Sequence, residues 1–195
     1  MLDIISRHAA VTRHVDAPIR RLCRAEAFRA ARFVGTLPEQ TRYRRFHCAM
    51  SLDMVGAHYD ALDWDTVIVL AWIERGETRG LAEVHPYPAH ACRETEIALS
   101  LQPFAVGMDG QKSRHSCLSE GHDPNGNADL SGDRLDLYSG HFGLALLVDA
   151  LSRAAATGAR RSRILLCPPD PVQAGFGRRL GAVFDAAEDA LIFTH

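Results

Sequence analysis

The sequence predicts one α/β domain with a mixed sheet, because its hydrophobic pattern changes period twice along the chain. The first third repeats apolar residues at helical spacing, whereas residues 65–103 form dense β-branched or alternating runs, as strands do. After residue 135 a helical pattern returns and two apolar runs follow. With 195 residues, 47% of them hydrophobic, the chain is long enough to bury the core of a single domain over 1–195.

Helices are expected in the first third over residues 17–34, 37–50 and 51–62, after an edge strand over 10–15. Asp16 and Ser51 are suited to cap the first and third of these helices. Pro38 suits the first turn of the second helix, and Glu39 is favourable beside the positive end of its dipole. This third of the chain therefore predicts helices that pack on a sheet.

The expected strands of the central part are residues 65–74, 79–88 and 95–103, the first two joined by the turn R-G-E-T. In the third strand Ile97, Leu99 and Leu101 share one face. Residues 104–135 are polar and rich in glycine, which predicts a long loop. Beyond it we expect a helix up to Gly158, a buried strand over 160–167, a short helix over 168–181 and a closing strand over 190–195.

Three motifs add to this order of elements. They are E-I-A-L-S-L-Q-P from Glu96 to Pro103, R-R-L-G-A-V-F over 178–184, and L-P-E-Q-T-R-Y-R-R-F-H-C-A-M-S over 37–51. Together they resemble the GNAT superfamily of N-acetyltransferases, and the last is similar to the opening helical segment of domains related to bacterial protein lysine acetyltransferases. The resemblance covers residues 37–195. It implies a mixed, mostly antiparallel central sheet flanked by helices, with residues 104–135 inserted after the fourth strand.

The resemblance also implies acetyl-CoA as a co-substrate, held between the strands 95–103 and 160–167. In the family the pantetheine pairs with the backbone of the fourth strand, and the pyrophosphate binds amides of the turn before the next helix. A helix N-terminus suits an anion, because its free N–H groups and its dipole both attract negative charge. The implied cofactor-binding residues are Leu99, Leu101, Ser139, Gly140, His141, Phe142 and Gly143.

The pyrophosphate turn departs from the family pattern R/Q-x-x-G-x-G/A. Aligned on the helix that follows, the pattern begins at Tyr138, where Arg or Gln is usual, and places His141 at the first glycine. Gly143 is the one consensus glycine retained. Two interpretations stay open: the His141 ring contacts phosphate, or the turn survives for folding alone and the site is lost.

The catalytic residues that the resemblance implies are also partly replaced. Attack on a thioester needs a neutral amine, so a carboxylate can serve as general base. Glu96 occupies the family's usual place, with Glu83 and Glu94 as alternatives, although a glutamate at a strand end is often a solvated charge. The position of the family's general-acid tyrosine falls on Gly177. Two alternatives follow: water protonates the leaving thiolate, or the reaction does not occur.

Two functions from different classes follow. The first is transfer of an acetyl group from acetyl-CoA to a primary amine, of a small molecule or a protein lysine, with the 104–135 loop beside the acceptor. The second is a catalytically inactive GNAT-like module that binds a ligand or a protein partner. The resemblance allows a homodimer, although no stretch of the sequence identifies an interface.

Composition argues against several other classes. A net charge of −2 offers no general attraction to nucleic acid or anionic membranes, and no apolar run is long enough to span a bilayer. Five scattered cysteines indicate no disulfide framework, and a cytoplasmic location is expected.

No metal is expected. The candidate zinc ligands His90, Cys92, His115, Cys117 and His122 lack a standard spacing. The calcium-like run Asp123, Asn125, Asn127, Asp129 has Ala128 and Arg134 where a glycine and an acidic ligand are required.

Overall fold

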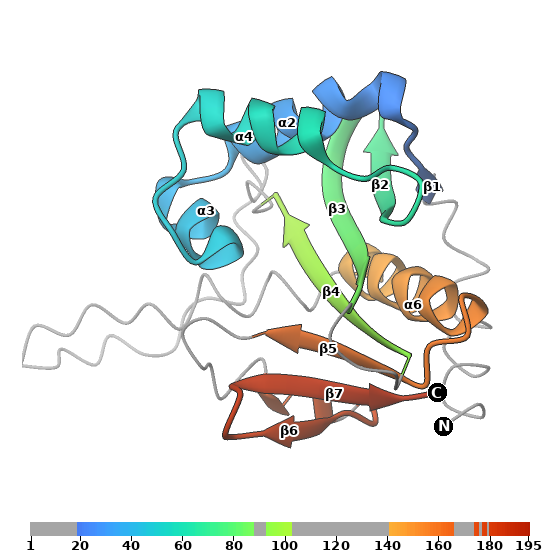
Figure 1. Ribbon diagram of the computed structural model, residues 1–195. Coiled ribbons are helices and arrows are strands. Elements are labelled where there is room, and N and C mark those ends of the chain that lie inside the picture. The colour runs from blue at the N-terminus through green and yellow to red at the C-terminus, as the bar shows by residue number, and fades with distance from the viewer. Residues whose placement is uncertain (1–18, 88–92, 103–140, 166–173, 176, 179) are drawn as a thin grey trace, which may run out of the picture.

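A seven-stranded mixed sheet with helices on both faces forms the body of the protein (Figure 1). The computed structural model describes residues 19–87, 93–102, 141–165, 174–175, 177–178 and 180–195. The strand order is β1-β2-β3-β4-β5-β7-β6. Every neighbouring pair is antiparallel except β4 and β5, which are parallel. The mixed, mostly antiparallel sheet expected from the sequence is therefore confirmed.

The strands are β1 (Ile19–Arg21), β2 (Ile68–Glu74), β3 (Glu77–Pro86), β4 (Glu94–Leu101), β5 (Arg161–Leu165), β6 (Val183–Asp185) and β7 (Ala190–Thr194). The helices are the 3₁₀ turn η1 (Arg24–Glu26), α2 (Ala27–Thr36), α3 (Glu39–Phe46), α4 (Leu52–Ala61) and α6 (His141–Ala156). A search of the described helices finds none with the length and apolar character of a membrane span.

Two hydrophobic clusters, one on each face of the sheet, hold these layers together. On one face α6 packs against a cluster that includes Val84 and Ile97, with Leu99 and Leu101 at its edge. The predicted alternation of the 95–103 strand is thus confirmed. On the other face α2 and α4 cover a second cluster that includes Leu81. Successive residues of β3 and β4 therefore point alternately toward α6 and toward α2, α3 and α4.

The helix predicted over 17–34 is wrong in its first half. Residues Ile19–Arg21 form β1, which pairs with the edge of β2, and the Leu22 N–H donates to the Val69 carbonyl at 2.8 Å. The η1 turn separates this strand from α2. The free edge of β2 offers hydrogen bonds that a longer helix would forgo, so tertiary pairing overrides local helical preference. The predicted edge strand over 10–15 and its neighbour Asp16 lie outside the described residues.

The other boundaries of the first half follow the sequence closely. The Ser51 hydroxyl accepts a hydrogen bond from the Met54 N–H at 3.2 Å, which confirms it as the N-cap of α4. Pro38 lies at the N-cap of α3, one position before the first turn. The β2–β3 turn has two residues instead of four: Arg75 and Gly76 both have positive φ, 51° and 83°, which matches the twist of a tight hairpin.

Near the C-terminus the sequence prediction missed a strand. Val183 and Phe184, the last two residues of the motif over 178–184, form β6 together with Asp185 and pair with β7. Three residues are too few for a strand period to be recognised. The closing strand itself is confirmed as β7. The predicted loop 104–135 and most of the short helix over 168–181 lie outside the described residues.

Close packing of α6 on β3 predicts a measurable difference between two glycines. A Cβ added at Gly80 would lie 2.8 Å from Leu101 Cδ2 and 3.1 Å from Leu146 Cδ2, whereas one added at Gly56 in α4 meets nothing within 4 Å. We expect Gly80→Ala to lower the free energy of unfolding by about 1 to 3 kcal/mol through overpacking. Gly56→Ala, the matched control, should raise it by about 0.5 to 1 kcal/mol. Urea unfolding measures both, and equal effects would contradict the packing argument.

Candidate functional site

The parallel strands β4 and β5 pair over three residues and then diverge, which leaves an opening in the middle of the sheet (Figure 1). Glu94, Thr95 and Glu96 are in register with residues 161–163. From Ile97 to Leu101 the edge of β4 that faces β5 has no strand partner among the described residues. Backbone N–H and C=O groups on such an edge can pair with an extended ligand.

Three ionisable residues are neighbours in register at the closed end of this opening, which we call the apex. His85 of β3 is the register partner of Glu96 of β4, which in turn is the register partner of Arg163 of β5. Directly paired residues share a face of the sheet, here the face toward α2, α3 and α4. Sequence reasoning missed His85. The signal was its i+2 spacing from Glu83 within an alternating strand, which placed both side chains on one face.

The three glutamates proposed as general base have different environments. Glu94 forms an ion pair with Arg161 at 2.9 Å. Glu83 is completely buried. Glu96 is half-buried at the apex, and its carboxylate forms no ion pair within the described part of the chain. Glu96 is therefore the one of the three that both borders the opening and is not tied to an arginine described here.

Glu83 is the centre of a buried polar network. Its Oε1 atom accepts hydrogen bonds from the Tyr59 hydroxyl at 2.6 Å and from Arg45 at 2.5 Å. Its Oε2 atom lies 2.9 Å from His85 Nε2. Burial alone would raise the pKa of Glu83, but Arg45, His85 and Tyr59 together hold that pKa well below its usual range. Glu83 is thus a fixed carboxylate that accepts hydrogen bonds and is not available to a substrate.

The other members of this network respond to the same buried charge. Burial would lower the pKa of Arg45, but the Glu83 carboxylate raises it above its ordinary value. For Tyr59, burial and then the nearby Glu83 charge both raise the pKa. Burial lowers the pKa of His58, which lies on α4 in edge contact with the Tyr59 ring. Arg45 and Glu83 therefore form a paired cation and anion next to the neutral phenol of Tyr59.

On the opposite face, a chain of hydroxyl and imidazole groups closes the apex beneath α6. The Thr95 and Ser162 hydroxyls are 2.8 Å apart, and the Ser162 hydroxyl is 2.7 Å from His195 Nε2. This chain links β4, β5 and β7. Both hydroxyls are buried, so their role is to hold the two parallel strands together at the point where they begin to diverge.

The proposed cofactor residues fall in two places. Leu99 and Leu101 lie on the open part of β4, on the face toward α6. The described part of α6 starts at His141, so His141, Phe142 and Gly143 are its first described residues. Ser139 and Gly140 lie outside the described residues, as do the candidate zinc and calcium ligands. Among the described residues, no group of three or more His, Cys, Asp or Glu could hold a metal ion.

Gly177, at the position where the family's acid tyrosine was expected, has no room for a side chain. A Cβ built there would lie 2.5 Å from both methyl groups of Leu191. Leu191 is itself buried in the cluster beneath α6. The loss of the tyrosine is therefore accompanied by a core residue that fills its space.

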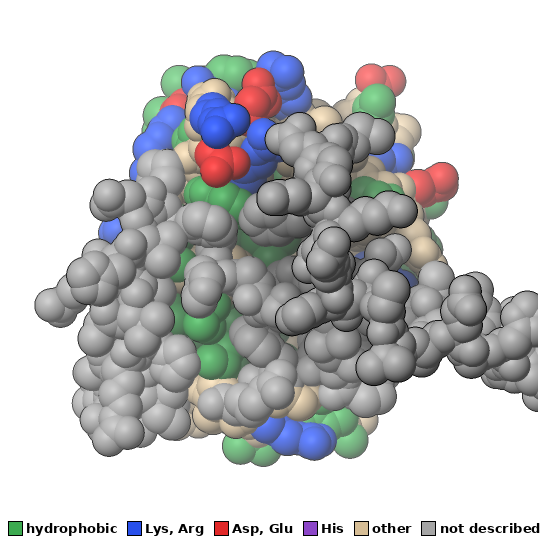
Figure 2. Space-filling model, turned by 180° about the vertical axis from the view of Figure 1, so that it is seen from behind, with side chains coloured by type: hydrophobic (Ala, Val, Ile, Leu, Met, Phe, Trp, Pro, Cys, Tyr) green, Lys and Arg blue, Asp and Glu red, His purple; other side chains and the backbone are tan. Residues whose placement is uncertain are grey.

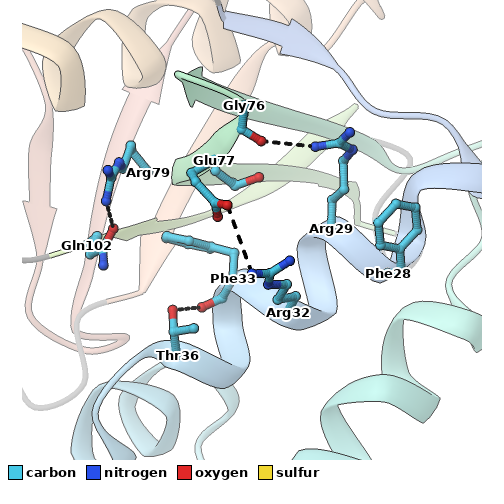
Figure 3. Close-up of a pocket in the computed structure, with 10 residues that line it drawn as sticks. Phe28, Arg29, Arg32, Phe33, Thr36, Gly76, Glu77, Arg79 and Gln102 are labelled. Atoms are coloured by element: carbon cyan, nitrogen blue, oxygen red, sulfur yellow. Dashed lines mark hydrogen bonds and ion pairs between the residues drawn. The ribbon is translucent and has the colours of Figure 1, made fainter.

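A separate pocket of about 140 Å³ lies between α2 and the β2–β3 hairpin (Figure 3). Its three arginines already have partners: Arg29 donates to the Gly76 carbonyl at 3.3 Å, Arg32 is 3.9 Å from Glu77, and Arg79 donates to Gln102 at 2.9 Å. Arg79 precedes His85 by six residues along β3, roughly 20 Å. The pocket is therefore distant from the apex.

Arginine and glutamate side chains gather at this end of the molecule, seen from behind in Figure 2. Residues that line the pocket form the ion pairs Arg29–Glu26, Arg32–Glu77 and Arg79–Glu74. Charges of both signs are intermixed here, so that the region presents a network of surface ion pairs instead of a patch of one sign.

The fold is that of the GNAT acetyltransferases, as comparison with solved structures shows. The GNAT domain of S. lividans PAT has a TM-score of 0.58 at 17% identity, over 91% of this chain and 89% of that chain. The PaiA N-acetyltransferase of Thermoplasma acidophilum, solved in complex with coenzyme A, has a TM-score of 0.54 at 12% identity, over 91% and 98% of the two chains. For the ribosomal-protein-alanine N-acetyltransferase of Brucella melitensis the values are 0.52 and 13%, over 89% and 96%.

Sequence comparison alone does not detect this similarity of fold, since no protein-family profile and no curated protein matches the chain. The resemblance inferred from the order of elements and three short motifs is confirmed by the fold.

The buried pair Arg45–Glu83 predicts a strong, non-additive effect on stability. Glu83→Gln or Arg45→Met should each lower the free energy of unfolding by about 3 to 5 kcal/mol, because each leaves one buried charge unpaired. The double variant should lose less than the sum of the two. Arg32→Met, which removes a surface partner of Glu77, should cost less than about 0.5 kcal/mol.

Urea unfolding at pH 7 measures these changes, and additive losses would contradict a direct interaction. Because the folded-state pKa of Glu83 is lowered, its stabilisation is complete above the unfolded-state pKa of about 4.3 and is lost as the pH falls through the folded-state value.

Proposed function

We propose that the protein binds acetyl-CoA in the opening between β4 and β5 and transfers the acetyl group to a primary amine. The observation that carries this proposal is the edge of β4 from Ile97 to Leu101, which begins directly beyond the apex and has no strand partner on the β5 side among the described residues. An opening between two parallel strands in the middle of a sheet exposes backbone that would otherwise be paired.

The pantetheine arm of coenzyme A matches this edge chemically. It is an extended chain with two amide groups, so it can pair with strand backbone as a peptide does. Two proteins of the same fold were solved with this ligand: the PaiA enzyme with coenzyme A, and a GNAT acetyltransferase of Brucella melitensis with acetyl-CoA. Recognition by backbone groups also tolerates the sequence divergence of this chain.

The first turn of α6 supports the other end of the ligand. α6 is described from His141 to Ala156, and the first turn of a helix offers free N–H groups and the positive end of the helix dipole; in this proposal His141 to Gly143 belong to that turn. A pyrophosphate is well suited to that place. Leu99 and Leu101 would border the pantetheine arm, and Ser139 and Gly140 would complete the turn.

Glu96 is the general base of this proposal. The thioester would lie at the apex, because the arm cannot pass the point where β4 and β5 are hydrogen-bonded. The amine nitrogen attacks the thioester carbon, the C–N bond forms, the C–S bond breaks, and a nearby carboxylate accepts the proton that the nitrogen loses. The leaving thiolate takes its proton from water, since Leu191 occupies the space at Gly177.

Ligand binding is the first test. A ligand that binds only the native state stabilises it by about 2.7 kcal/mol at a hundred times its Kd, which for a chain of this size is about 5 to 10 °C in Tm. We expect coenzyme A and acetyl-CoA at millimolar concentration to raise Tm by several degrees, whereas inorganic pyrophosphate at the same concentration leaves it unchanged. No rise with either form of coenzyme A would refute the proposal.

Turnover tests the role of Glu96. With acetyl-CoA and a panel of polyamines, aminoglycosides and lysine peptides as acceptors, Glu96→Gln should reduce kcat by about 10² to 10⁴. Its affinity for coenzyme A should be unchanged. Glu94→Gln, two residues earlier on the same face, is the control and should stay within about threefold of the wild type. If coenzyme A binds and no amine is acetylated, the protein is the inactive binding module instead.

A further inference from the structure

We propose that His85, held by Glu83, removes the first of the two protons that an ammonium acceptor must lose. The inference rests on the proposed acetyl transfer and assigns a catalytic residue to it. Glu96 keeps its role during C–N bond formation, and His85 prepares the neutral amine before that step.

The stoichiometry of the reaction requires two proton acceptors. An amine that arrives as R–NH₃⁺ loses one proton before its lone pair can attack the thioester carbon, and a second as the C–N bond forms. One proton ends on the thiol of coenzyme A and the other is released to solvent. A carboxylate has an ordinary pKa near 4, whereas histidine has one near 6.5. An imidazole is therefore better matched to accepting the first proton near neutral pH.

The register of the sheet places His85 beside the reacting groups. His85 and Glu96 are directly opposite on β3 and β4, which places their Cβ atoms about 4.5 to 5.5 Å apart on the same face. The His85 side chain is 29% exposed, whereas that of Glu83 is 1% exposed. His85 can thus reach both the apex and solvent, and the carboxylate behind it can reach neither.

The contact with Glu83 selects the tautomer of His85. The Glu83 carboxylate is ionised and can accept hydrogen bonds only, so His85 Nε2 must carry the hydrogen that lies on the 2.9 Å contact. In the neutral ring the lone pair is then on Nδ1. When Nδ1 takes a proton, the positive ring remains hydrogen-bonded to the buried carboxylate, which stabilises it.

Each element packed around His85 carries a charged or titratable group. Glu83 lies on the same strand, Arg45 on α3, His58 and Tyr59 on α4, Glu96 on β4 and Arg163 on β5. Arg45 is paired with Glu83 and Arg163 with Glu188, so neither cation faces His85 without a counter-charge. Glu83 and Glu96 remain the two anions nearest to an imidazolium at this position.

The test compares two acceptors of different protonation state in the full-length protein. Hydroxylamine is neutral at pH 7.5, whereas the best amine of the acceptor panel is an ammonium ion. His85→Gln should reduce kcat/KM for the ammonium acceptor by about 100-fold and leave the hydroxylamine rate within threefold. Equal losses for both acceptors, or no loss for either, would overturn the proposal.

A second measurement separates this inference from the proposed function, because it needs no turnover. NMR of the ¹⁵N-labelled histidine rings, with the His85 signals assigned through His85→Gln, reports which nitrogen carries the hydrogen at pH 7.5. We expect hydrogen on Nε2 and none on Nδ1. A ring with its hydrogen on Nδ1 would refute the inference even if acetyl transfer occurs. Coenzyme A binding to His85→Gln, measured by thermal shift, should match the wild type.

Discussion

The contact between Arg45 and Glu83 is the interaction on which the arrangement of the apex depends. α3 contains no buried residue, and its sequence E-Q-T-R-Y-R-R-F is strongly polar. Its attachment to the sheet therefore depends on side chains that reach inward. The Arg45 side chain, 6% exposed, extends from the helix to the fully buried carboxylate on β3. Together with Phe46, which packs against the cluster under α2 and α4, and Arg42, which donates to the Leu37 carbonyl, this ion pair fixes a polar helix beside the opening between β4 and β5.

An apolar pair of similar size would hold α3 with comparable stability, since desolvation offsets much of the attraction within a buried ion pair. What the ion pair adds is a defined orientation of the side chains that surround Glu83. A carboxylate has two oxygen atoms, and Arg45 and Tyr59 both bind Oε1, which leaves Oε2 for His85. The same contact that positions α3 also orients an imidazole next to Glu96. Structure and chemistry are coupled here through the two atoms of one side chain.

Local sequence patterns predict those elements that depend on interactions between residues close together in the chain. The hairpin, the alternation of Ile97 with Leu99 and the Ser51 cap all depend on residues within a few positions of one another. The strands β1 and β6 have three residues each, and only their partners β2 and β7 make them strands. Their prediction requires knowledge of the sheet, which no short window contains.

The residues of the candidate site also differ in whether the local sequence identifies them. Glu96 is recognisable from its strand motif, whereas Glu83 looks equally suitable in the sequence and becomes a structural anion only when Arg45 reaches it from a distant helix. The position of His85 opposite Glu96 is visible only when the register of β3 against β4 is known. Steric exclusion by Leu191 at Gly177 also depends on two segments that the sequence does not place together.

The gap between β4 and β5 also has a consequence for solubility. From Ile97 onward, β4 is in effect an edge strand inside a sheet, and exposed edges can pair with strands of other molecules. A ligand that pairs with this edge would occupy those hydrogen-bonding groups and act as a temporary strand. If acetyl-CoA binds there as proposed, it would protect the protein from intermolecular association, and the ligand-free protein would be the form with the greater tendency to aggregate.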